Sequence, residues 1–392
     1  MRRAVPFLTD VIIVGGGHSG LTLAAALGTA GINVVCLERG SPKAKKISDG
    51  RTIALSYRSM KLLQQAGVAD LIKPNACPIL DIRVADQDSA SFLDFDHREV
   101  GDDPFGWITE NILFQAALEK RIAKLKNVTI VAGAAIKDID YNTASARVIL
   151  EDDRIFEADL LVGADGRKSF CREQAGIATY GWDYHQTAIV CTIKHSLPHN
   201  NVAVEHFQPG GPFATLPMTG QRSSIVWTEK TAAAEALMKM GIEEFTSLLQ
   251  EKVEDYLGDI SLIGGRFSYP LQLQHALFYH ATRLALVGDA AHGIHPIAGQ
   301  GLNLGMGDIA VLVEELTRAS HLGLDLGSPV ILKRFEKRRK LDNGNMVLAT
   351  DLLDRLFSTA APPVQAARRF GLGMVSALPP LKRFFMRTAM GG

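Results

Sequence analysis

The sequence predicts an α/β protein with two closely joined domains and a helical C-terminal region. Three observations support this fold class. A short apolar strand at residues 10–14 runs into a glycine-rich turn and then a helix. Short strands separated by proline and glycine turns fill residues 184–229. A second glycine-rich block, residues 288–305, follows the apolar strand 283–287 and opens another helix.

Length and composition exclude several classes of protein. A chain of 392 residues is too long for one compact core. Its net charge of zero gives no support to a nucleic-acid partner. The apolar run after Met1 is too short for a signal peptide, and no uncharged stretch reaches the ~20 residues that span a bilayer. We therefore expect a cytoplasmic protein, soluble or peripheral on the inner face of the membrane.

The cysteines and histidines carry no metal or disulfide signature. The four cysteines are scattered without C-x-x-C spacing, at Cys36, Cys77, Cys171 and Cys191. This pattern is typical of buried, reduced thiols in a cytosolic protein. His292 and His295 form H-x-x-H, but no further ligand stands at metal-site spacing. We expect no metal, and a structural or pocket-wall role for these histidines.

The first glycine-rich turn has the full context of a dinucleotide site. An apolar strand (10–14), G-x-G-x-x-G (15–20), a helix (21–29) and a second strand (33–37) follow in order, and Glu38 ends the second strand. This order of elements is the one that a dinucleotide-binding fold requires. A structural glycine turn alone leaves the acid at the strand end unexplained.

Each residue type in this turn has an expected role. Gly15 makes the tight turn, Gly17 lets the backbone approach a pyrophosphate, and Gly20 permits close packing of helix on strand. Glu38 accepts hydrogen bonds from the adenosine ribose. The cofactor-binding residues expected here are Gly15, Gly17, His18, Ser19, Gly20, Glu38 and Arg39, with the His18 side chain a bystander at the helix N-terminus.

The middle of the chain mixes helices and strands. A helix is predicted over 111–126, and the buried strand 160–163 ends in an Asp165-Gly166 turn that enters a short helix. The other predicted strands are 128–132, 146–150, 187–193, 201–207, 213–216, 223–227 and 262–275. Residues 231–258 are predicted to be helical, and the chain beyond 330 is basic and helical. The β-rich run is a candidate second domain.

The block at 288–305 describes a backbone folded closely around a ligand. Its glycines permit dihedral angles and close approaches that a Cβ blocks. We expect the following helix to begin at about Gly307, with its free N–H groups facing the ligand and favouring negative charge there. Because this block lies far along the chain from the first turn, the two segments are predicted to grip one long cofactor.

Three motifs together resemble a known family. G-x-G-x-x-G at 15–20, the Asp-Gly block at 165–172 and Gly288-Asp289 form the triple fingerprint of group A flavoprotein monooxygenases, which have the p-hydroxybenzoate hydroxylase fold. Within that superfamily, His-Pro-Ile-Ala-Gly-Gln-Gly-Leu-Asn-Leu-Gly at 295–305, followed by Asp308, resembles the ubiquinone-biosynthesis hydroxylases. The further segments that resemble them are 49–56, 110–111, 211–217, 338–339 and 350–358.

The resemblance implies a specific domain organisation. It predicts a Rossmann-like FAD-binding domain interleaved with a β-sheet substrate domain, followed by a C-terminal helical region. The FAD-binding domain takes residues 1–75, 99–183 and 276–330. The substrate domain takes residues 76–98 and 184–275, and the C-terminal region takes residues 331–392.

The resemblance also assigns roles around FAD. Asp289 would hydrogen-bond the ribityl chain, Gly288 is a further expected cofactor-binding residue, and Asp165 is linked to FAD and nicotinamide binding. Arg51 contacts the cofactor and borders the active site. The backbone amides that face the flavin pyrimidine edge belong to Gly299, Gln300, Gly301, Leu302 and Asn303. Gln115 lies on a helix where relatives carry a cofactor-contacting residue, and Arg172 is expected to be a structural ion-pair partner.

Catalytic and substrate residues follow from the same resemblance. Pro296 would lie beside the isoalloxazine ring, and His295 and Arg51 would complete the catalytic residues, although neither His292 nor His295 is expected to be a general base. The β-rich region would roof the substrate side of the flavin through Phe213, Leu216, Pro217 and Trp227. An aromatic stripe of this kind is also typical of an ordinary core.

The implied chemistry is aromatic hydroxylation. NAD(P)H would reduce FAD, O2 would give a flavin C4a-hydroperoxide, and its distal oxygen would transfer to a ring carbon of a polyprenylated phenol in ubiquinone biosynthesis. The apolar, aromatic and basic segment 370–387 would either rest on an anionic membrane or pack on the protein body. Other ubiquinone-biosynthesis proteins are candidate partners.

Alternatives remain open at the level of the sequence. One is another FAD-dependent aromatic hydroxylase, reductase or halogenase of this fold, although the W-x-W-x-I-P motif of halogenases is missing. A further one is a non-catalytic flavoprotein or lipid-binding subunit of a biosynthetic assembly. The hydroxylated carbon, the prenyl length, the oligomeric state and the choice among NADH, NADPH and a redox protein as donor also remain open.

Overall fold

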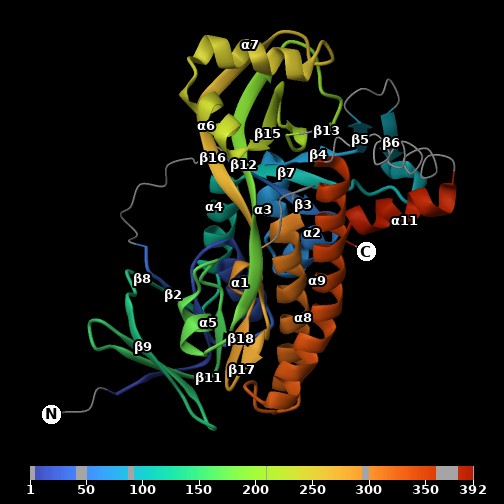
Figure 1. The fold of residues 1–392 in the computed structure, drawn as a ribbon. Coiled ribbons are helices and arrows are strands. Elements are labelled where there is room, and N and C mark those ends of the chain that lie inside the picture. The colour runs from blue at the N-terminus through green and yellow to red at the C-terminus, as the bar shows by residue number, and fades with distance from the viewer. Residues whose placement is uncertain are drawn as a thin grey trace.

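The computed structural model describes residues 5–40, 51–86, 92–208, 210–293, 300–358 and 378–391. In these residues two large mixed sheets are joined by a small three-stranded sheet and flanked by long helices (Figure 1). The predicted α/β class is therefore confirmed. No helix in the described part of the chain is both long and apolar enough to cross a membrane.

The first sheet carries the predicted dinucleotide-binding elements. Its main path has the order β17-β18-β11-β1-β2-β8, and β9 and β10 extend it as a hairpin paired to β11. The strands are β1 (Phe7–Val14), β2 (Val34–Glu38), β8 (Val128–Ala132), β9 (Ile136–Tyr141), β10 (Ala146–Leu150), β11 (Ile155–Gly163), β17 (His280–Ala281) and β18 (Leu284–Leu286). Helix α1 (His18–Thr29) connects β1 to the parallel strand β2 and contacts α4 (Asn111–Ile122).

The second sheet has the order β19-β16-β12-β15-β14-β13-β5-β6. Its strands are β5 (Asp81–Asp86), β6 (Phe92–Asp96), β12 (Thr179–His195), β13 (Val202–Phe207), β14 (Phe213–Met218), β15 (Arg222–Lys230), β16 (Ile260–Ala276) and β19 (His292–Gly293). The two long strands β12 and β16 pair with each other and extend from beside the first sheet to the far end of the second sheet (Figure 1). Helices α6 (Thr231–Lys239) and α7 (Ile242–Val253) pack on one face of the second sheet.

A small antiparallel sheet lies between the two large ones. Its order is β3-β7-β4, from Thr52–Ser56, Gly106–Glu110 and Cys77–Ile79 respectively. The shorter helices are α2 (Tyr57–Gln65), α3 (Ala69–Ile72), η1 (Lys73–Asn75), η2 (His97–Glu99), α5 (Phe170–Gln174) and η3 (Gly288–Ala290). The sequence did not predict this sheet.

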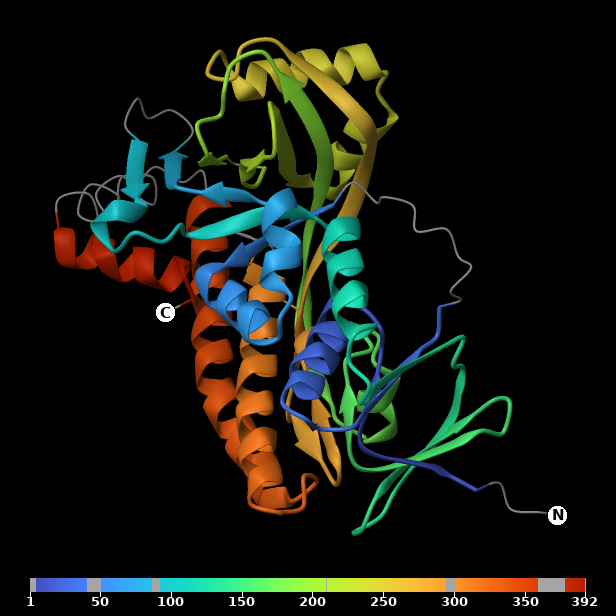
Figure 2. The same ribbon diagram turned by 180° about the vertical axis from the view of Figure 1, so that it is seen from behind.

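Three helices are described from residue 300 onward, outside the undescribed segment 359–377. Helices α8 (Gln300–His321) and α9 (Pro329–Ser358) lie side by side along the molecule (Figures 1 and 2). Helix α11 (Pro379–Ala389) extends sideways away from α9 and lies beside β5 and β6 in both views. Residues 359–377, which include part of the predicted amphipathic segment, lie outside the described residues.

Most predicted elements are found within a few residues, and two boundaries need correction. The strands predicted at 128–132 and 146–150 match β8 and β10. The helix predicted from Gly307 begins at Gln300, because the glycines at 301 and 305 continue a helix instead of preceding it. The helical region 231–258 is two helices, since Met240 and Gly241 adopt extended backbone between them.

Strand β5 pairs with β13 and with β6, so both β5 and β6 join the sheet built from residues 179–276. This pairing agrees with the grouping of 76–98 with 184–275, although the domain division itself stays a prediction.

Candidate functional site

The first glycine turn has the geometry that its sequence predicts. Gly15 has a φ of +110°, and a Cβ there would stand 2.3 Å from the carbonyl oxygen of Ala164. A Cβ on Gly20 would stand 1.8 Å from the carbonyl oxygen of Gly15. At Gly17, the N-cap of α1, a Cβ would meet no described atom within 4 Å. The turn is therefore closed toward the sheet and open on the side where a phosphate would approach.

Glu38 reaches this turn from the end of β2. Its Oε2 accepts a hydrogen bond from the Gly16 amide at 2.5 Å, and its Oε1 accepts one from the Gly40 amide at 2.6 Å. Arg39 is exposed beside it. The carboxylate thus lies within reach of a group bound at the turn, in the place expected of a ribose acceptor.

Helix α4 brings a further side chain to the turn. The Nε2 of Gln115 donates to the carbonyl oxygen of Gly16 at 3.3 Å and to Glu119 at 3.0 Å. His18 packs against Phe114, with ring centroids 5.1 Å apart. The expectation that Gln115 stands near the cofactor is thus consistent with its position, and its role stays a prediction.

The second glycine turn lies directly against the first. Gly288 has a φ of +60°, and a Cβ there would stand 2.8 Å from the Ser19 hydroxyl. A Cβ on Gly305 of α8 would stand 3.0 Å from the Gly288 Cα. Ser19 therefore lies where α1, η3 and α8 meet, and the two turns that are 273 residues apart (288 − 15) form one cradle.

A buried carboxylate holds the second turn. Oδ2 of Asp308 accepts a hydrogen bond from the Gly288 amide at 3.0 Å and pairs with His292 Nε2 at 2.6 Å. Its Oδ1 accepts from Arg339 Nε at 2.8 Å and from Asn343 Nδ2 at 3.1 Å. Burial alone would raise the pKa of this carboxyl, but its interactions with His292 and Arg339 outweigh burial and hold the pKa at about 2.

The same network continues through aromatic side chains. Asn343 Nδ2 also donates to the Tyr279 hydroxyl at 3.1 Å, and that hydroxyl lies 2.8 Å from His275 Nε2. Burial raises the pKa of Tyr279 and lowers the pKa of His275. In the sequence, Asp308 and Arg339 appeared only as parts of a motif, and neither was given a role. Nothing local in the sequence reveals that they pair.

Asn303 fastens the start of α8 to the small sheet. Its Oδ1 accepts from the Ser56 amide at 2.9 Å and from the Ser59 hydroxyl at 2.7 Å. Its Nδ2 donates to the Ala54 carbonyl oxygen at 2.8 Å. The side chain is thus a structural clamp, and the predicted role of its backbone amide toward a flavin remains a prediction. Nearby, Gly301 has an open Cβ position, and Leu302 packs on the core.

Several predicted residues fall outside what the structure describes. His295, Pro296 and Gly299 lie in the segment 294–299, and of Gln300 only the backbone is described. The catalytic roles expected of His295 and Pro296 therefore stay predictions.

The Asp-Gly block presents an unsatisfied carboxylate oxygen. Asp165 Oδ2 accepts from the Cys171 amide at 3.0 Å, whereas its buried Oδ1 has no hydrogen-bond partner in the described residues. A buried acceptor of this kind calls for a donor, which a bound ligand would supply. Among the described residues Arg172 makes no ion pair, so the expected structural ion pair is not found there. Its guanidinium donates instead to the carbonyl oxygens of Ala290 and Arg167, at 2.9 Å each.

A cavity of about 540 Å³ adjoins these turns. Arg51, Arg167 and Asp289 line it together with residues of the small sheet and the second sheet. The Arg51 guanidinium carbon lies 5.0 Å from the centre of the Tyr269 ring, which also lines the cavity. The aliphatic lining residues are Ala54, Ile79, Ile82, Ala188, Val190, Ala203, Val204, Ala214, Leu216, Val226 and Leu271. The cavity is therefore lined by a few charged side chains and by many aliphatic ones.

The structure divides the four predicted substrate residues. Leu216 lines the cavity, but Phe213 and Trp227 lie on the other face of the sheet, in the core against α6 and α7. Their ring centroids are 6.0 Å apart. Because side chains alternate along a strand, Ala214 and Leu216 face the cavity while Phe213 and Pro217 do not. The expectation that Phe213, Pro217 and Trp227 line the substrate site is corrected accordingly.

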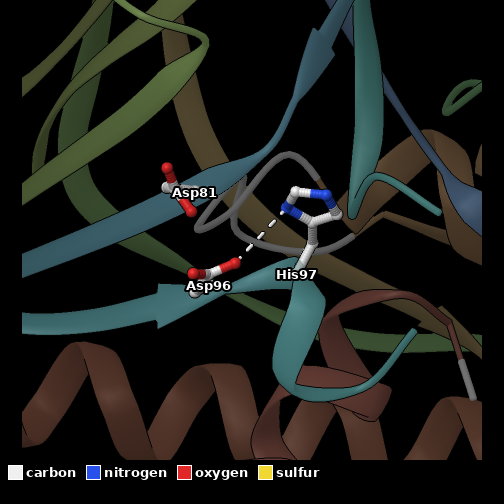
Figure 3. A group of neighbouring side chains, drawn as sticks. All are labelled: Asp81, Asp96 and His97. Atoms are coloured by element: carbon white, nitrogen blue, oxygen red, sulfur yellow. Dashed lines mark ion pairs between the residues drawn. The ribbon is translucent and has the colours of Figure 1, made fainter. Parts of the chain in front are cut away.

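One group of metal-binding residue types lies apart from the cavity. Asp81, Asp96 and His97 bring one ligand atom each within 4.8 Å of one another (Figure 3). His97 Nδ1 lies 2.8 Å from the Leu80 carbonyl oxygen, and Asp96 accepts three hydrogen bonds from the side chain of Arg98. His97 and Asp96 thus already have hydrogen-bond partners within this part of the protein.

The residues of the two turns fit a long dinucleotide such as FAD. The open Gly17, the acceptor Glu38, the unsatisfied Asp165 and the start of α8 surround the region beside the cavity. They supply close backbone approach for a pyrophosphate, a ribose acceptor and the partial positive charge of a helix N-terminus.

Comparison with known proteins agrees with this geometry. Residues 8–341 match the FAD binding domain family. Among solved structures, p-nitrophenol 4-monooxygenase PnpA from Pseudomonas putida has a TM-score of 0.81 at 19% identity and covers 99% of both chains, which establishes the fold alone.

Curated relatives narrow the family. Ubiquinone hydroxylase UbiL of Rhodospirillum rubrum is 46% identical over 386 residues, which cover 98% of this chain and 90% of that protein. Ubiquinone biosynthesis monooxygenase COQ6 of Danio rerio is 34% identical over 435 residues, which cover 97% of this chain and 90% of that protein. The chain therefore belongs to the FAD-binding monooxygenase family that includes the ubiquinone hydroxylases.

Proposed function

We propose that the protein hydroxylates a ring carbon of a polyprenylated phenol on the route to ubiquinone. The observation that carries this proposal is the cavity between the sheets, which adjoins Asp289 and Arg51 and is otherwise mostly aliphatic. The names of the relatives UbiL and COQ6 support the quinone precursor as substrate class. One oxygen atom of O2 enters the product, the other leaves as water, and NAD(P)H supplies the two electrons.

FAD, when bound, supplies the oxygen chemistry, and the protein supplies binding, orientation and exclusion of water. The two glycine turns hold the dinucleotide, and Asp289 stands between them and the cavity. The aliphatic lining keeps water from the reacting ring. Arg51 and Arg167 both line the cavity and place positive charge there, which stabilises negative charge on a phenolate or on the cofactor.

A direct assay tests this function. Protein reconstituted with FAD is mixed with NADH or NADPH and a phenol that carries a short prenyl chain under ¹⁸O2. We expect donor and oxygen consumption in step with a product that gains one ¹⁸O atom. Full conversion of the oxygen to H2O2 with no labelled product contradicts the proposal and favours a reductase. Protein that binds no FAD contradicts the family's cofactor role here.

We further propose that α11 rests on a membrane surface. Phe384 and Phe385 are 63% and 43% exposed, and Arg383 and Arg387 are exposed on the same helix. Exposed aromatic rings beside basic side chains are typical of helices that lie on anionic lipid. Flotation with vesicles of phosphatidylglycerol and phosphatidylcholine tests this contact. Binding to the anionic vesicles that disappears in the double variant F384S/F385S supports it, and equal flotation of both proteins contradicts it.

A further inference from the structure

Different strands form the two sides of the cavity. Tyr269 and Gln272 come from β16, at one side of the second sheet, whereas Ala203 and Ile82 come from β13 and β5 at the other. Strands β12 and β13 are three strand spacings apart, or roughly 15 Å, so the two sides of the cavity are well separated. The Arg51 guanidinium lies over the Tyr269 ring at the β16 side. Aliphatic side chains line the cavity from Leu271 of β16 across to Ile82 of β5, and we call the β13–β5 side the aliphatic side. Glu205 of β13 is the acidic exception on that side.

The aliphatic side continues beyond the cavity into a small core. Ile79 and Ala203, which line the cavity, belong to one buried cluster with Met386 of α11. Ile82 and Leu216 line the cavity and pack against the same cluster. Met390, which follows the helix, packs there as well. Side chains of this apolar cluster therefore stand between the cavity's aliphatic end and the inner face of α11.

Helix α11 is held to the body at both ends. Lys382 near its start pairs with Glu99 at 2.6 Å. At its end the Arg58 amide donates to the Met390 carbonyl oxygen at 3.1 Å, and the Arg58 guanidinium donates to the Gly391 carbonyl oxygen at 2.9 Å. The outer face carries the exposed rings of Phe384 and Phe385. The helix is thus fixed at its ends, with apolar side chains both toward the cavity and toward solvent.

We propose that the prenyl chain of the substrate leaves the cavity along Ile82, Ala203 and Leu216 and emerges past Met386 beside α11. This inference rests on the proposed function, because it concerns the tail of that same substrate. The aromatic head would then lie by Arg51 and Asp289. A flexible methionine is suited to the exit, since its side chain moves aside more easily than a branched one. Each further prenyl unit that packs against apolar side chains along the route leaves water, and this strengthens the binding of the substrate.

Ala203 is the position that tests the route most sharply. It pairs with Ile82 across β13 and β5, and both line the cavity. Its side chain is a single methyl group, so Ala203→Phe fills the route without adding charge. We expect the ratio of kcat/KM for the prenylated phenol to kcat/KM for the tail-less phenol to fall by roughly tenfold or more. An unchanged ratio overturns the proposed route.

A matched control and an independent readout complete the experiment. Ala232→Phe adds the same ring at an exposed position of α6, on the other face of the sheet, and should leave the ratio unchanged. If Ala203→Phe fails to fold, Met386→Trp is tested instead, because the larger side chain narrows the exit. This variant should lower kcat/KM, and the penalty should be larger for a phenol with two prenyl units than for a phenol with one. Equal penalties overturn the route.

Titration of FAD absorbance with each phenol measures binding without turnover. Wild-type protein that binds the prenylated phenol more tightly but oxygenates neither phenol contradicts the proposed function and leaves the route supported.

Discussion

The two glycine turns that face each other across Ser19 are held in different ways. At Gly15 and Gly20 the neighbouring backbone leaves no room for a side chain, so the glycines themselves determine the turn. At Gly288 a buried carboxylate, Asp308, fixes the amide from α8, and Arg339 of α9 holds that carboxylate. The first turn depends on glycines that carry no side chain, and the second depends on charged side chains from distant elements.

This difference implies different costs for mutation. A steric constraint affects the local turn and whatever binds there. A buried ionic network joins η3, α8 and α9, so its loss also leaves charged groups without partners inside the protein. Changes at the second turn should therefore lower the stability of the whole fold, and changes at the first should mainly weaken cofactor binding.

The largest effect is expected for Asp308→Ala. The substitution removes the acceptor of the Gly288 amide, of Arg339 and of Asn343, and it removes the partner of His292. Breaking a buried ion pair from one side costs about 3–5 kcal/mol. We expect the free energy of unfolding of the apoprotein, measured in urea, to fall by about that amount, and FAD to be lost during purification.

Arg318→Ala is the matched control for this loss. Arg318 pairs with Glu314 on the same helix, but both side chains are about half exposed. An exposed pair of this spacing contributes about 0.3–0.5 kcal/mol. If the two variants lose similar stability, the buried network contributes no more to the fold than a surface ion pair does.

The next effect is expected at the first turn. Gly20→Ala would place a methyl group 1.8 Å from the Gly15 carbonyl oxygen, which is backbone and cannot turn aside. The turn must open, and we expect FAD affinity to fall by at least about thirtyfold, equivalent to about 2 kcal/mol. Tryptophan and flavin fluorescence titrations measure this loss.

Gly17→Ala separates the effect of this turn on cofactor binding from its effect on protein stability. A methyl group at Gly17 meets no described atom within 4 Å, so the apoprotein should keep its stability in urea. The same methyl group projects where a pyrophosphate would approach, so FAD affinity should still fall. Unimpaired FAD binding by this variant would argue that the cofactor lies elsewhere.

The contrast also explains which parts of the site the sequence could reveal. Gly15, Gly17, Gly20 and Glu38 are close in sequence, and the backbone geometry of one turn dictates their types. Strands such as β8 and β10 were predictable for a similar reason, since their apolar patterns are local.

The missed features depend on distant partners. Asp308 and Arg339 are 31 residues apart and become a pair only when α8 and α9 pack together. The small sheet joins β3, β4 and β7 from three separate segments. Phe213 and Trp227 were placed on the wrong face because an aromatic pattern shows that a strand is buried, not which of its two faces meets the cavity.

A pH titration should reveal the buried carboxylate with a smaller effect. The pKa of Asp308 is about 2 in the folded protein against 3.8 for an ordinary aspartate. Because the folded pKa is the lower one, the stabilisation is complete above about pH 5 and is lost as the pH falls through 4 toward 2. The difference corresponds to about 2 kcal/mol.

Asp308→Asn should flatten this part of the pH profile of unfolding. The amide keeps the shape of the carboxylate but does not titrate, so the variant is less stable at pH 6 and differs less from wild type at pH 3. The readout is the urea midpoint at each pH. A variant whose profile parallels that of the wild type would place the acid sensitivity in other carboxylates.

The smallest effect is expected for Glu38→Gln. The carboxylate lies at the edge of the first turn, and its interactions there are with the amides of Gly16 and Gly40. Glutamine keeps one acceptor oxygen, so the loss of charge should weaken FAD binding by about tenfold, or 1.4 kcal/mol, with little change in the stability of the apoprotein. Isothermal titration with FAD and urea unfolding measure the two quantities separately. A large loss of apoprotein stability here would place Glu38 with Asp308 as a support of the fold, and the distinction between the two turns would then disappear.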